Sequence, residues 1–295
     1  MSLNKAPIIG SAFAKDPNIN DAPADVLITG AGGRAGSAIA ERLAAAGHTV
    51  NAQTRAKDGD LSISAFVAPG TKTVIHCAAE LPGPKSSAAG IARNNVTATR
   101  NLIEAALTAG AERFLFFSAI SVYGQVNENM VTEATPITNP DAYGASKLLG
   151  EQMLAEVAEQ LPSISLRLPA IVGAGDQPNW LSRTVDKLRA GKPVHFINPD
   201  NPFNNAVHID DLADFIINLL GQPLRGAHVI NLAGVDTISV GEMVAVLKVE
   251  LGSSSEVTSE VRPEQPGFTI NCSLAREKFG WKPMSMAALL ARLAA

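Results

Sequence analysis

Tyr143 and Lys147 are the two residues in this sequence whose types and spacing most directly suggest chemistry. They lie four positions apart in DAYGASKLLGE, a segment that favours a helix, so their side chains share one face and lie one turn apart. An ammonium beside a phenol favours the phenolate, and we expect it to lower the tyrosine pKa from its ordinary value of about 10. The pair is therefore predicted to act as an acid and base, although an exposed helical face would show the same short pattern.

A glycine-rich turn, VLITGAGGRAG, places Gly30, Gly33 and Gly36 between an expected strand and an expected helix. Glycine lets the backbone turn tightly and approach a pyrophosphate, which then meets the free N–H groups and the positive dipole end of the helix. The spacing is GxxGxxG, and its context of strand, turn and helix favours dinucleotide binding over an ordinary turn.

The choice between the two nicotinamide dinucleotides depends on the residues that follow the second strand. An acid there would accept a hydrogen bond from the adenosine 2′-OH, whereas an arginine would pair with a 2′-phosphate. The segment TVNAQTRAKDGD has no acid before Asp58, while Arg55 follows the strand and Arg34 lies within the glycine loop. Two guanidinium groups could bind one phosphate. We therefore expect NADP, with NAD as the alternative, since loop arginines are often merely solvated.

The elements that position these residues alternate along the chain from Asp25. Short β-branched runs are interleaved with longer segments rich in Ala, Leu and Glu, an order that predicts parallel strands joined by helical crossovers. The expected strands are 26–29, 49–52, 73–77, 113–118 and 164–168, and the expected helices are 34–46, 88–109 and 142–160. The predicted fold class is α/β, a doubly wound parallel sheet of the Rossmann type with a smaller C-terminal substrate lobe.

The chain is expected to divide into a nucleotide domain and this smaller lobe. Residues 1–24 are interpreted as a loose leader, 25–168 as the NAD(P)-binding domain and 169–295 mainly as the substrate-binding lobe, with part of 209–232 returning to the sheet. After residue 169 the regular alternation of strands and helices is interrupted by two loops rich in Gly, Pro and Asn, VGAGDQPN and NPDNPFNN.

Composition argues against several kinds of partner. The formal net charge of −4 at pH 7 gives no basic footprint for nucleic acid. No apolar run approaches the roughly 20 residues that a membrane span needs. Cys77 and Cys272 lie far apart and the five histidines are scattered, so no metal site is expected. A cytoplasmic protein acting on a small molecule fits best.

In combination, these segments resemble the extended short-chain dehydrogenases/reductases of the NAD-dependent epimerase/dehydratase family. The matching segments keep the family order from about residue 25 to residue 283: TGAGGRAG, DGDLS, VIHCAA, NNVTATRNLIEAA, FFSAISVYG, TEATPITNPDAYGASKLLGE, LRLPAIVGAG, NNAVHIDDLADFI and REKFGWKP. The resemblance is specific for the family and says little about the substrate.

The resemblance implies a role for individual residues. Tyr143 would be the acid/base, and Lys147 would bind the nicotinamide ribose while lowering the pKa of the tyrosine. The other implied contacts are Gly30, Gly33 and Gly36 at the pyrophosphate, Asp60 and Leu61 at the adenine, Ala78 and Ala79 along the cofactor, and Asn179 and Arg262 near the diphosphate of a nucleotide sugar. The resemblance also implies a homodimer, joined through a four-helix bundle of residues 88–109 and 142–160.

The stretch FFSAISVYG departs from the family pattern, in which two successive hydroxyl residues precede Val-Tyr-Gly by two positions and the second hydroxyl is catalytic. Ala119 occupies that second place. The loss of one such donor typically lowers the rate about 10²- to 10³-fold. If the strand continues, Ser121 returns to the face of Ala119 while Ser118 turns away. Ser121 is therefore the first candidate replacement and Ser118 the second, and the absence of any replacement remains an alternative.

We expect an NADP-dependent oxidoreductase, epimerase or dehydratase that transfers hydride at a hydroxyl- or keto-bearing carbon, with nucleotide sugars as the substrate class that the resemblance implies. A carbonyl reductase acting on a non-nucleotide substrate remains open, because arginine at the ribose suits a reductive role. A different class of protein, a dinucleotide-sensing regulator with weakened catalysis, is favoured by Ala119 and opposed by the pair of Tyr143 and Lys147.

Overall fold

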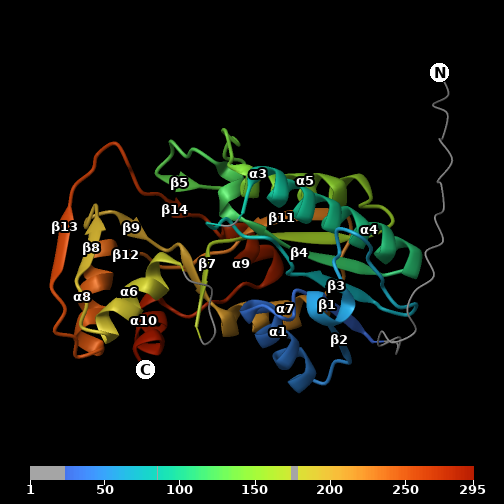
Figure 1. Ribbon diagram of the computed structural model, residues 1–295, viewed down its shortest axis with the longest axis horizontal. Coiled ribbons are helices and arrows are strands. Elements are labelled where there is room, and N and C mark those ends of the chain that lie inside the picture. Colours follow the sequence, from blue (N-terminus) through green and yellow to red (C-terminus); the bar gives the residue numbers. More distant parts are fainter. Residues whose placement is uncertain (1–23, 85, 174–178) are drawn as a thin grey trace.

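The computed structural model describes residues 24–84, 86–173 and 179–295, and its centre is a six-stranded parallel sheet (Figure 1). The strands occur in the order β11-β6-β4-β3-β1-β2, so the strand order reverses between β1 and β3. Their bounds are β1 Val26–Thr29, β2 Val50–Gln53, β3 Thr73–His76, β4 Arg113–Ala119, β6 Ser163–Leu168 and β11 Ala227–Asn231. In such sheets ligands bind at the carboxyl ends of the strands, beside the reversal. The predicted Rossmann-type α/β fold is confirmed.

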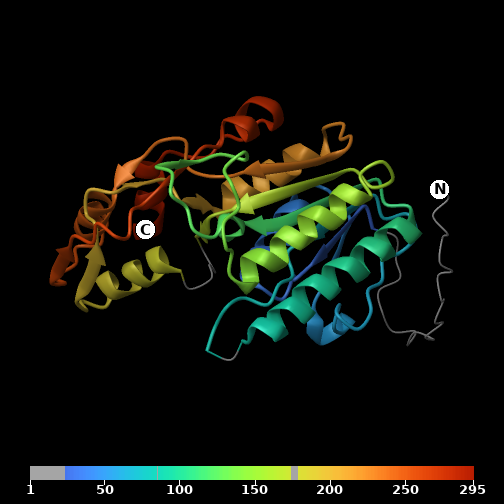
Figure 2. The ribbon, with the colours of Figure 1, turned by 90° about the horizontal axis from the view of Figure 1, so that it is seen from above.

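Helices cover both faces of the sheet (Figures 1 and 2). One face carries α1 (Arg34–Ala45) and α7 (Ile209–Leu220), which pack on each other, and the other carries α4 (Ala98–Ala109) and α5 (Ala142–Glu156). The helix expected at 88–109 is interrupted, because α3 (Ala88–Ile91) leads into a π-helical turn before α4 begins. The π-helical turn spans Ala92–Thr97, and such turns occur frequently at functional sites.

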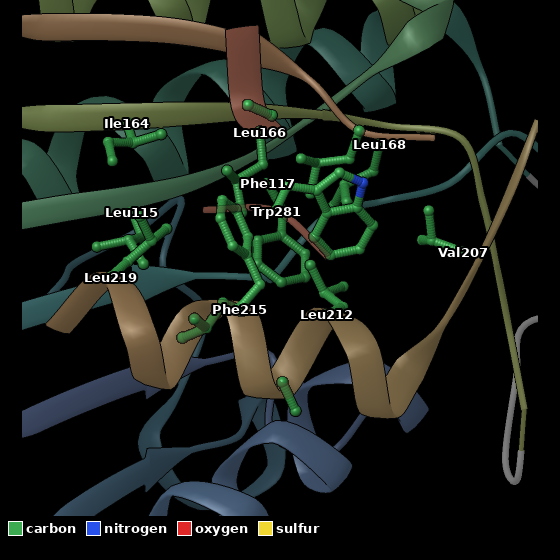
Figure 3. Packing of buried hydrophobic residues seen from close by; sticks show 14 of the residues in the cluster. Leu115, Phe117, Ile164, Leu166, Leu168, Val207, Leu212, Phe215, Leu219 and Trp281 are labelled. Atoms are coloured by element: carbon green, nitrogen blue, oxygen red, sulfur yellow. The ribbon is translucent and has the colours of Figure 1, made fainter. Parts of the chain in front are cut away.

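Side chains from the sheet and α7 form the main core (Figure 3). Along β4, Leu115 and Phe117 belong to this core, whereas Phe114 and Phe116 point to the opposite side, towards α4 and α5. This alternation follows the period of two of a strand, and both faces are buried as expected in a parallel sheet. Trp281 is buried in the same core and donates its indole N–H to the Ala233 carbonyl at 2.9 Å. The segment that contains Trp281 is thus part of the core of the sheet, although it lies near the end of the chain.

A second apolar cluster holds together the smaller lobe, at the left of Figure 1. Its elements are α6 Trp180–Arg189, β8 Val194–Ile197, α8 Val240–Glu250, β13 Val257–Glu260 and α10 Met286–Ala294. The connections between the lobe and the sheet include the paired strands β7 Ala170–Val172 and β10 Ala206–His208. The remaining elements are α2 Arg55–Asp58, a 3₁₀ helix Ile120–Tyr123, β5 Met130–Val131, β9 Pro202–Phe203, β12 Ile238–Ser239, β14 Thr269–Ile270 and α9 Ser273–Phe279.

Candidate active site

A cavity of about 1040 Å³ lies at the carboxyl ends of the central strands. This is the edge of the sheet at which a doubly wound fold binds its ligands. The predicted site residues that line the cavity are Gly30, Gly33, Arg34, Gly36, Arg55, Asp60, Leu61, Ala78, Ala79, Ser118, Ser121, Tyr143, Lys147 and Asn179. Arg262 is the exception, because it does not line the cavity and forms an exposed ion pair with Glu260.

The glycine loop is packed too tightly for side chains. Gly30 has a φ of +75°, and a Cβ atom there would lie 2.6 Å from the Ala78 nitrogen. A Cβ atom at Gly36 would lie 2.4 Å from the Gly30 carbonyl oxygen. Gly33 is the N-cap of α1 and donates its own N–H to the Gly30 carbonyl at 2.9 Å. The loop therefore leaves the N-terminus of α1 facing the cavity without a covering side chain, the arrangement that binds a pyrophosphate.

The far end of the cavity, where β2 gives way to α2, contains two acids that are engaged in local hydrogen bonds. Asp58 accepts the Thr54 backbone N–H at 2.7 Å. Asp60 accepts the Ser62 backbone N–H at 2.9 Å and the Ser62 hydroxyl at 2.8 Å, and these bonds lower the pKa of Asp60. Neither carboxylate belongs to the end of β2, the position from which an acid would reach a ribose 2′-OH.

Two arginines line the same end of the cavity. Arg34 begins α1 directly after the glycine loop, and Arg55 begins α2. Arg55 lies 3.6 Å from Asp60, measured from Nε to Oδ2, and its side chain is 68% exposed. An ion pair this exposed contributes little free energy, so the guanidinium of Arg55 can turn towards an anion in the cavity at small cost.

Tyr143 and Lys147 reach the cavity from the first turns of α5. Asp141 is the N-cap of this helix, and its carboxylate accepts the Gly144 N–H at 2.7 Å. Lys147 is 2% exposed, and its Nζ lies 4.8 Å from the ring centroid of Phe116 and 5.6 Å from that of Tyr143. Burial lowers the pKa of Lys147 to about 8. The lysine is therefore an ammonium at neutral pH and loses its proton in the mildly alkaline range.

The pKa of Tyr143 differs from the prediction. Burial, followed by the charge of Asp141, raises it to about 12. The predicted lowering of the Tyr143 pKa is therefore wrong. Desolvation of the phenol dominates, and the Lys147 ammonium lies over the aromatic rings of Phe116 and Tyr143. The phenol is thus protonated throughout the ordinary pH range, a state suited to donating a proton.

The two candidate hydroxyls have different surroundings. Strand β4 ends at Ala119 and a 3₁₀ helix follows, so the alternation expected beyond Ala119 does not hold, although Ser121 and Ala119 line the same cavity. Ser118 donates its hydroxyl to the buried carboxylate of Glu151. The Ser121 hydroxyl is buried and has no hydrogen-bond partner within the described ranges. A buried polar atom without a partner costs about 1 to 3 kcal/mol, which a substrate oxygen would offset.

Asn205 is a cavity residue that the sequence reasoning missed. Its Oδ1 is buried and accepts no hydrogen bond from any residue that the structure describes. Asn205 precedes β10, whose Ala206 pairs with Ala170, two residues beyond the end of β6. A lone asparagine in a loop carries no distinctive spacing. The only signal was its place in the matching segment NNAVHIDDLADFI.

Asn95 and Glu80 were missed as well. Asn95 is buried in the π-helical turn, accepts the Glu80 N–H at 2.7 Å and donates to the Ser146 hydroxyl at 3.1 Å. It thereby ties the loop after β3 to α5 beside Tyr143. A buried asparagine in the middle of an expected helix was the available signal, because asparagine is a weak helix former.

The described residues contain neither a metal-binding cluster nor a membrane-spanning helix. Among residues 24–84, 86–173 and 179–295, no group of three or more His, Cys, Asp or Glu side chains is placed to hold a metal ion. In the same part of the chain, no helix is both long and apolar enough to cross a membrane.

Comparison with known proteins identifies the family. The model of the NAD dependent epimerase/dehydratase family matches residues 26–233, which is more than half of the chain. The chain therefore belongs to this family, and the resemblance inferred from the motifs is confirmed.

Individual relatives are similar at moderate identity. The UDP-glucose 4-epimerase of Erwinia amylovora is 30% identical over 220 residues, 64% of this chain and 64% of that protein. That of Vibrio cholerae is 28% identical over 303 residues, 88% of this chain and 91% of the relative. Among solved structures, MoeE5 in complex with UDP-glucose and NAD is 27% identical with a TM-score of 0.77, over 92% of this chain and 97% of MoeE5. The chain spans less than two thirds of the length of several curated relatives that it matches.

Proposed function

We propose that the protein is an enzyme that transfers hydride between a nicotinamide dinucleotide and a hydroxyl- or keto-bearing carbon of a small molecule. The observation that carries this proposal is that three features line one cavity: the bare glycine loop, the pair of Tyr143 and Lys147, and the Ser121 hydroxyl, which has no hydrogen-bond partner among the described residues. Gly30 and Gly36 leave space only for backbone, which suits the pyrophosphate of such a cofactor. The bound dinucleotide would supply or accept the hydride.

The side chains of this chain would handle the accompanying proton. Tyr143, protonated at neutral pH, donates its phenolic proton to the substrate oxygen as hydride arrives at carbon. Ser121 donates a second hydrogen bond to the same oxygen and stabilises the negative charge that develops there. Lys147, whose Nζ lies 5.6 Å from the centroid of the Tyr143 ring, would donate hydrogen bonds to the nicotinamide ribose. In the reverse direction the phenol must first lose its proton to solvent, after which the phenolate of Tyr143 accepts the proton of the substrate hydroxyl.

The substrate class that we propose first is a nucleotide sugar. Three observations support it: family membership, the UDP-glucose 4-epimerases among the relatives, and the UDP-glucose bound by MoeE5. The substrate would lie between the sheet edge and the lobe formed mainly by residues 169–295, where Asn179 lines the cavity. Arg262 would have to leave its ion pair with Glu260 to reach a diphosphate.

A second candidate substrate, a carbonyl compound without a nucleotide, is favoured by the distribution of charge. Among the described residues that line the cavity, the cations are Arg34, Arg55 and Lys147. The first two lie at the glycine loop and α2, and the third at the catalytic tyrosine. None comes from β7, β10 or the residues after them, so the described substrate end offers a diphosphate no positive charge.

The test of the proposal measures NADPH oxidation with a panel of nucleotide sugars and simple ketones, together with NAD-dependent epimerisation of UDP-glucose. Turnover that Tyr143→Phe removes would support hydride-transfer chemistry, and the substrate used would decide between the two classes. Tight dinucleotide binding without turnover on any member of the panel would contradict the proposal and favour a dinucleotide-sensing regulator.

The quaternary structure in this proposal is a homodimer joined through α4 and α5. These helices lie side by side on one face of the sheet (Figure 2), and Leu149 of α5 is exposed on that surface. Light scattering on Leu149→Glu would detect the loss of the dimer, and a parent protein that is monomeric would contradict the proposed dimer.

The cytoplasmic location stays a prediction.

NADP(H) is proposed to bind at least tenfold more tightly than NAD(H), a difference of about 1.4 kcal/mol. The reason is that Arg34 and Arg55 line the cavity where β2 supplies no acid. The double change Arg34→Ala with Arg55→Ala should weaken NADP(H) selectively, measured by calorimetry. Lys57→Ala, which removes a neighbouring cation that does not line the cavity, is the control. Equal dissociation constants for the two cofactors in the parent protein would remove the argument.

The rate of reduction should fall as the pH rises through about 8. Below that pH Lys147 is an ammonium and holds the ribose, whereas above it the lysine is neutral; Tyr143, with a pKa of about 12, stays protonated in both ranges. The pH profile of kcat/KM for reduction is the measurement, and Lys147→Met should lack the midpoint near pH 8. A profile that stays flat well above pH 8 would show that the lysine charge has no part in the reaction.

A further inference from the structure

A buried carboxylate lies one helical turn beyond Lys147 on α5. Glu151 and Arg167 of β6 are each 5% exposed. They form two hydrogen bonds, from Arg167 Nε to Glu151 Oε1 at 3.0 Å and from Arg167 Nη2 to Oε2 at 2.7 Å. Ser118 of β4 donates its hydroxyl to Oε1. One carboxylate therefore connects α5 to two adjacent strands of the sheet.

This cluster needs an explanation other than stability. Removing two opposite charges from water costs several kcal/mol per ion, and well-packed apolar residues of similar size often stabilise a fold as well as a buried pair does. Arg167 Nη1 is in addition buried without a hydrogen-bond partner within the described part of the chain, and the guanidinium lies over the Tyr123 ring, with Cζ 4.7 Å from the ring centroid. A buried pair of fixed geometry is better suited to selecting one position and one rotation of a helix.

The backbone of α5 lies unusually close to β4 and to the 3₁₀ helix that follows it. A Cβ atom at Gly144 would lie 2.2 Å from the Ser121 carbonyl oxygen of the 3₁₀ helix, and one at Gly150 would lie 2.5 Å from Phe116 Cζ of β4. The helix thus touches these two elements through glycines, which fix its distance but provide no directional contact. Directional contact comes from Glu151, which occurs four residues after Lys147.

The cluster also sets the charge around Lys147. The neighbouring β3 contributes His76 and Cys77, which are both uncharged near neutral pH because burial lowers the pKa of His76 to about 3 and raises that of the Cys77 thiol. Two groups raise the pKa of Lys147 against the effect of burial, Cys77 first and Glu151 second, and of these Glu151 forms the ion pair with Arg167. The negative charge of Glu151 is in turn shared with Arg167 and the Ser118 hydroxyl.

We propose that Glu151, bound to Arg167 and Ser118, is a positioning residue that seats α5 on the sheet and keeps Lys147 charged and in place at the cavity. This inference rests on the proposed function for the use of Lys147. It also explains why the first hydroxyl of the stretch FFSAISVYG has a structural role. Ser118 binds Glu151 and helps to hold α5 on the sheet, so that Ser121 is the serine of this stretch left to bind a substrate.

The experiment compares the full chain with Glu151→Gln and with the control Glu156→Gln, which alters an exposed carboxylate of the same helix. NMR titration of the lysine ε-CH₂ signals, with Lys147 assigned from Lys147→Arg, reports the lysine midpoint without any ligand. We expect Glu151→Gln to lower that midpoint by about one pH unit, a tenfold change in proton affinity. Glu156→Gln should leave it unchanged.

Ser118→Ala keeps the ion pair and provides a second readout if Glu151→Gln fails to fold. Removal of one donor takes away a dipole that partly compensates the charge of Glu151, so the midpoint of Lys147 should rise slightly, in the direction opposite to that of Glu151→Gln. A lower melting temperature with an unmoved Lys147 midpoint in every variant that folds would overturn the proposal and leave a structural role only. NADPH affinity, measured in parallel, separates the two proposals. The Lys147 midpoint could shift as expected while Lys147→Met leaves the NADPH affinity unchanged. That result would support the positioning role of Glu151 and refute the use of Lys147 in cofactor binding.

Discussion

Tyr143→Phe is expected to lower kcat by about 10³-fold, within the range of about 10² to 10⁴ that a positioned acid or base contributes. The change keeps the buried ring and its contact with Lys147 and deletes only the oxygen that carries the proton. Because the glycine loop and the arginines are untouched, the dissociation constant for NADPH should stay within about twofold. Steady-state turnover and fluorescence titration of NADPH measure the two quantities.

The second tyrosine of the chain provides a matched control. Tyr123 is fully buried, donates its hydroxyl to Asn231 Oδ1 at 2.8 Å and does not line the cavity. Tyr123→Phe should therefore cost about 1 kcal/mol of unfolding free energy, the usual value of one hydrogen bond, and leave kcat within about threefold. A Tyr143→Phe variant as active as the parent would mean that another group moves the proton.

The fold was predictable where a local pattern determines it. The strands at 26–29, 73–77, 113–118 and 164–168 were found within a residue or two, because short β-branched runs between helices have few alternatives. The π-helical turn Ala92–Thr97 could not be read from the pattern, since one extra residue in a turn preserves the helical composition. Strand β11 was anticipated only as part of a segment returning to the sheet, because its pairing with β6 is a tertiary contact.

The candidate site likewise contains parts that the sequence predicts and parts that depend on the tertiary structure. The glycine loop and the pair of Tyr143 and Lys147 are local patterns, and the structure brings them to one cavity. The pKa of Tyr143 could not be foreseen, because it depends on how deeply α5 buries the phenol. Arg262 was placed by resemblance alone, and it does not line the cavity; its exposed ion pair with Glu260 would not by itself keep it from a ligand. Asn205 reaches the cavity through the pairing of β7 and β10, which no spacing in the sequence encodes.

Ser121→Ala should lower kcat by about 10²-fold, the usual effect of removing one donor from a developing oxyanion. The buried Ser121 hydroxyl has no partner within the described ranges and lines the cavity next to Ala119, whereas the Ser118 hydroxyl is already bound to Glu151. Binding of NADPH should be unaffected. The measurement is single-turnover hydride transfer, which isolates the chemical step from product release.

Ala119→Ser decides whether the catalytic hydroxyl has moved or has been lost. If Ser121 supplies the donor, a hydroxyl added at position 119, which is 8% exposed at the end of β4, duplicates a contact already made and should change kcat by less than about threefold. In the double variant, Ala119→Ser should restore much of the rate that Ser121→Ala removes, because both positions line the same cavity. If instead Ser121→Ala is silent and Ala119→Ser raises turnover, the parent protein works without a serine donor. Tyr143 is then left to donate to the substrate oxygen, because the Ser118 hydroxyl, which also lines the cavity, is bound to Glu151.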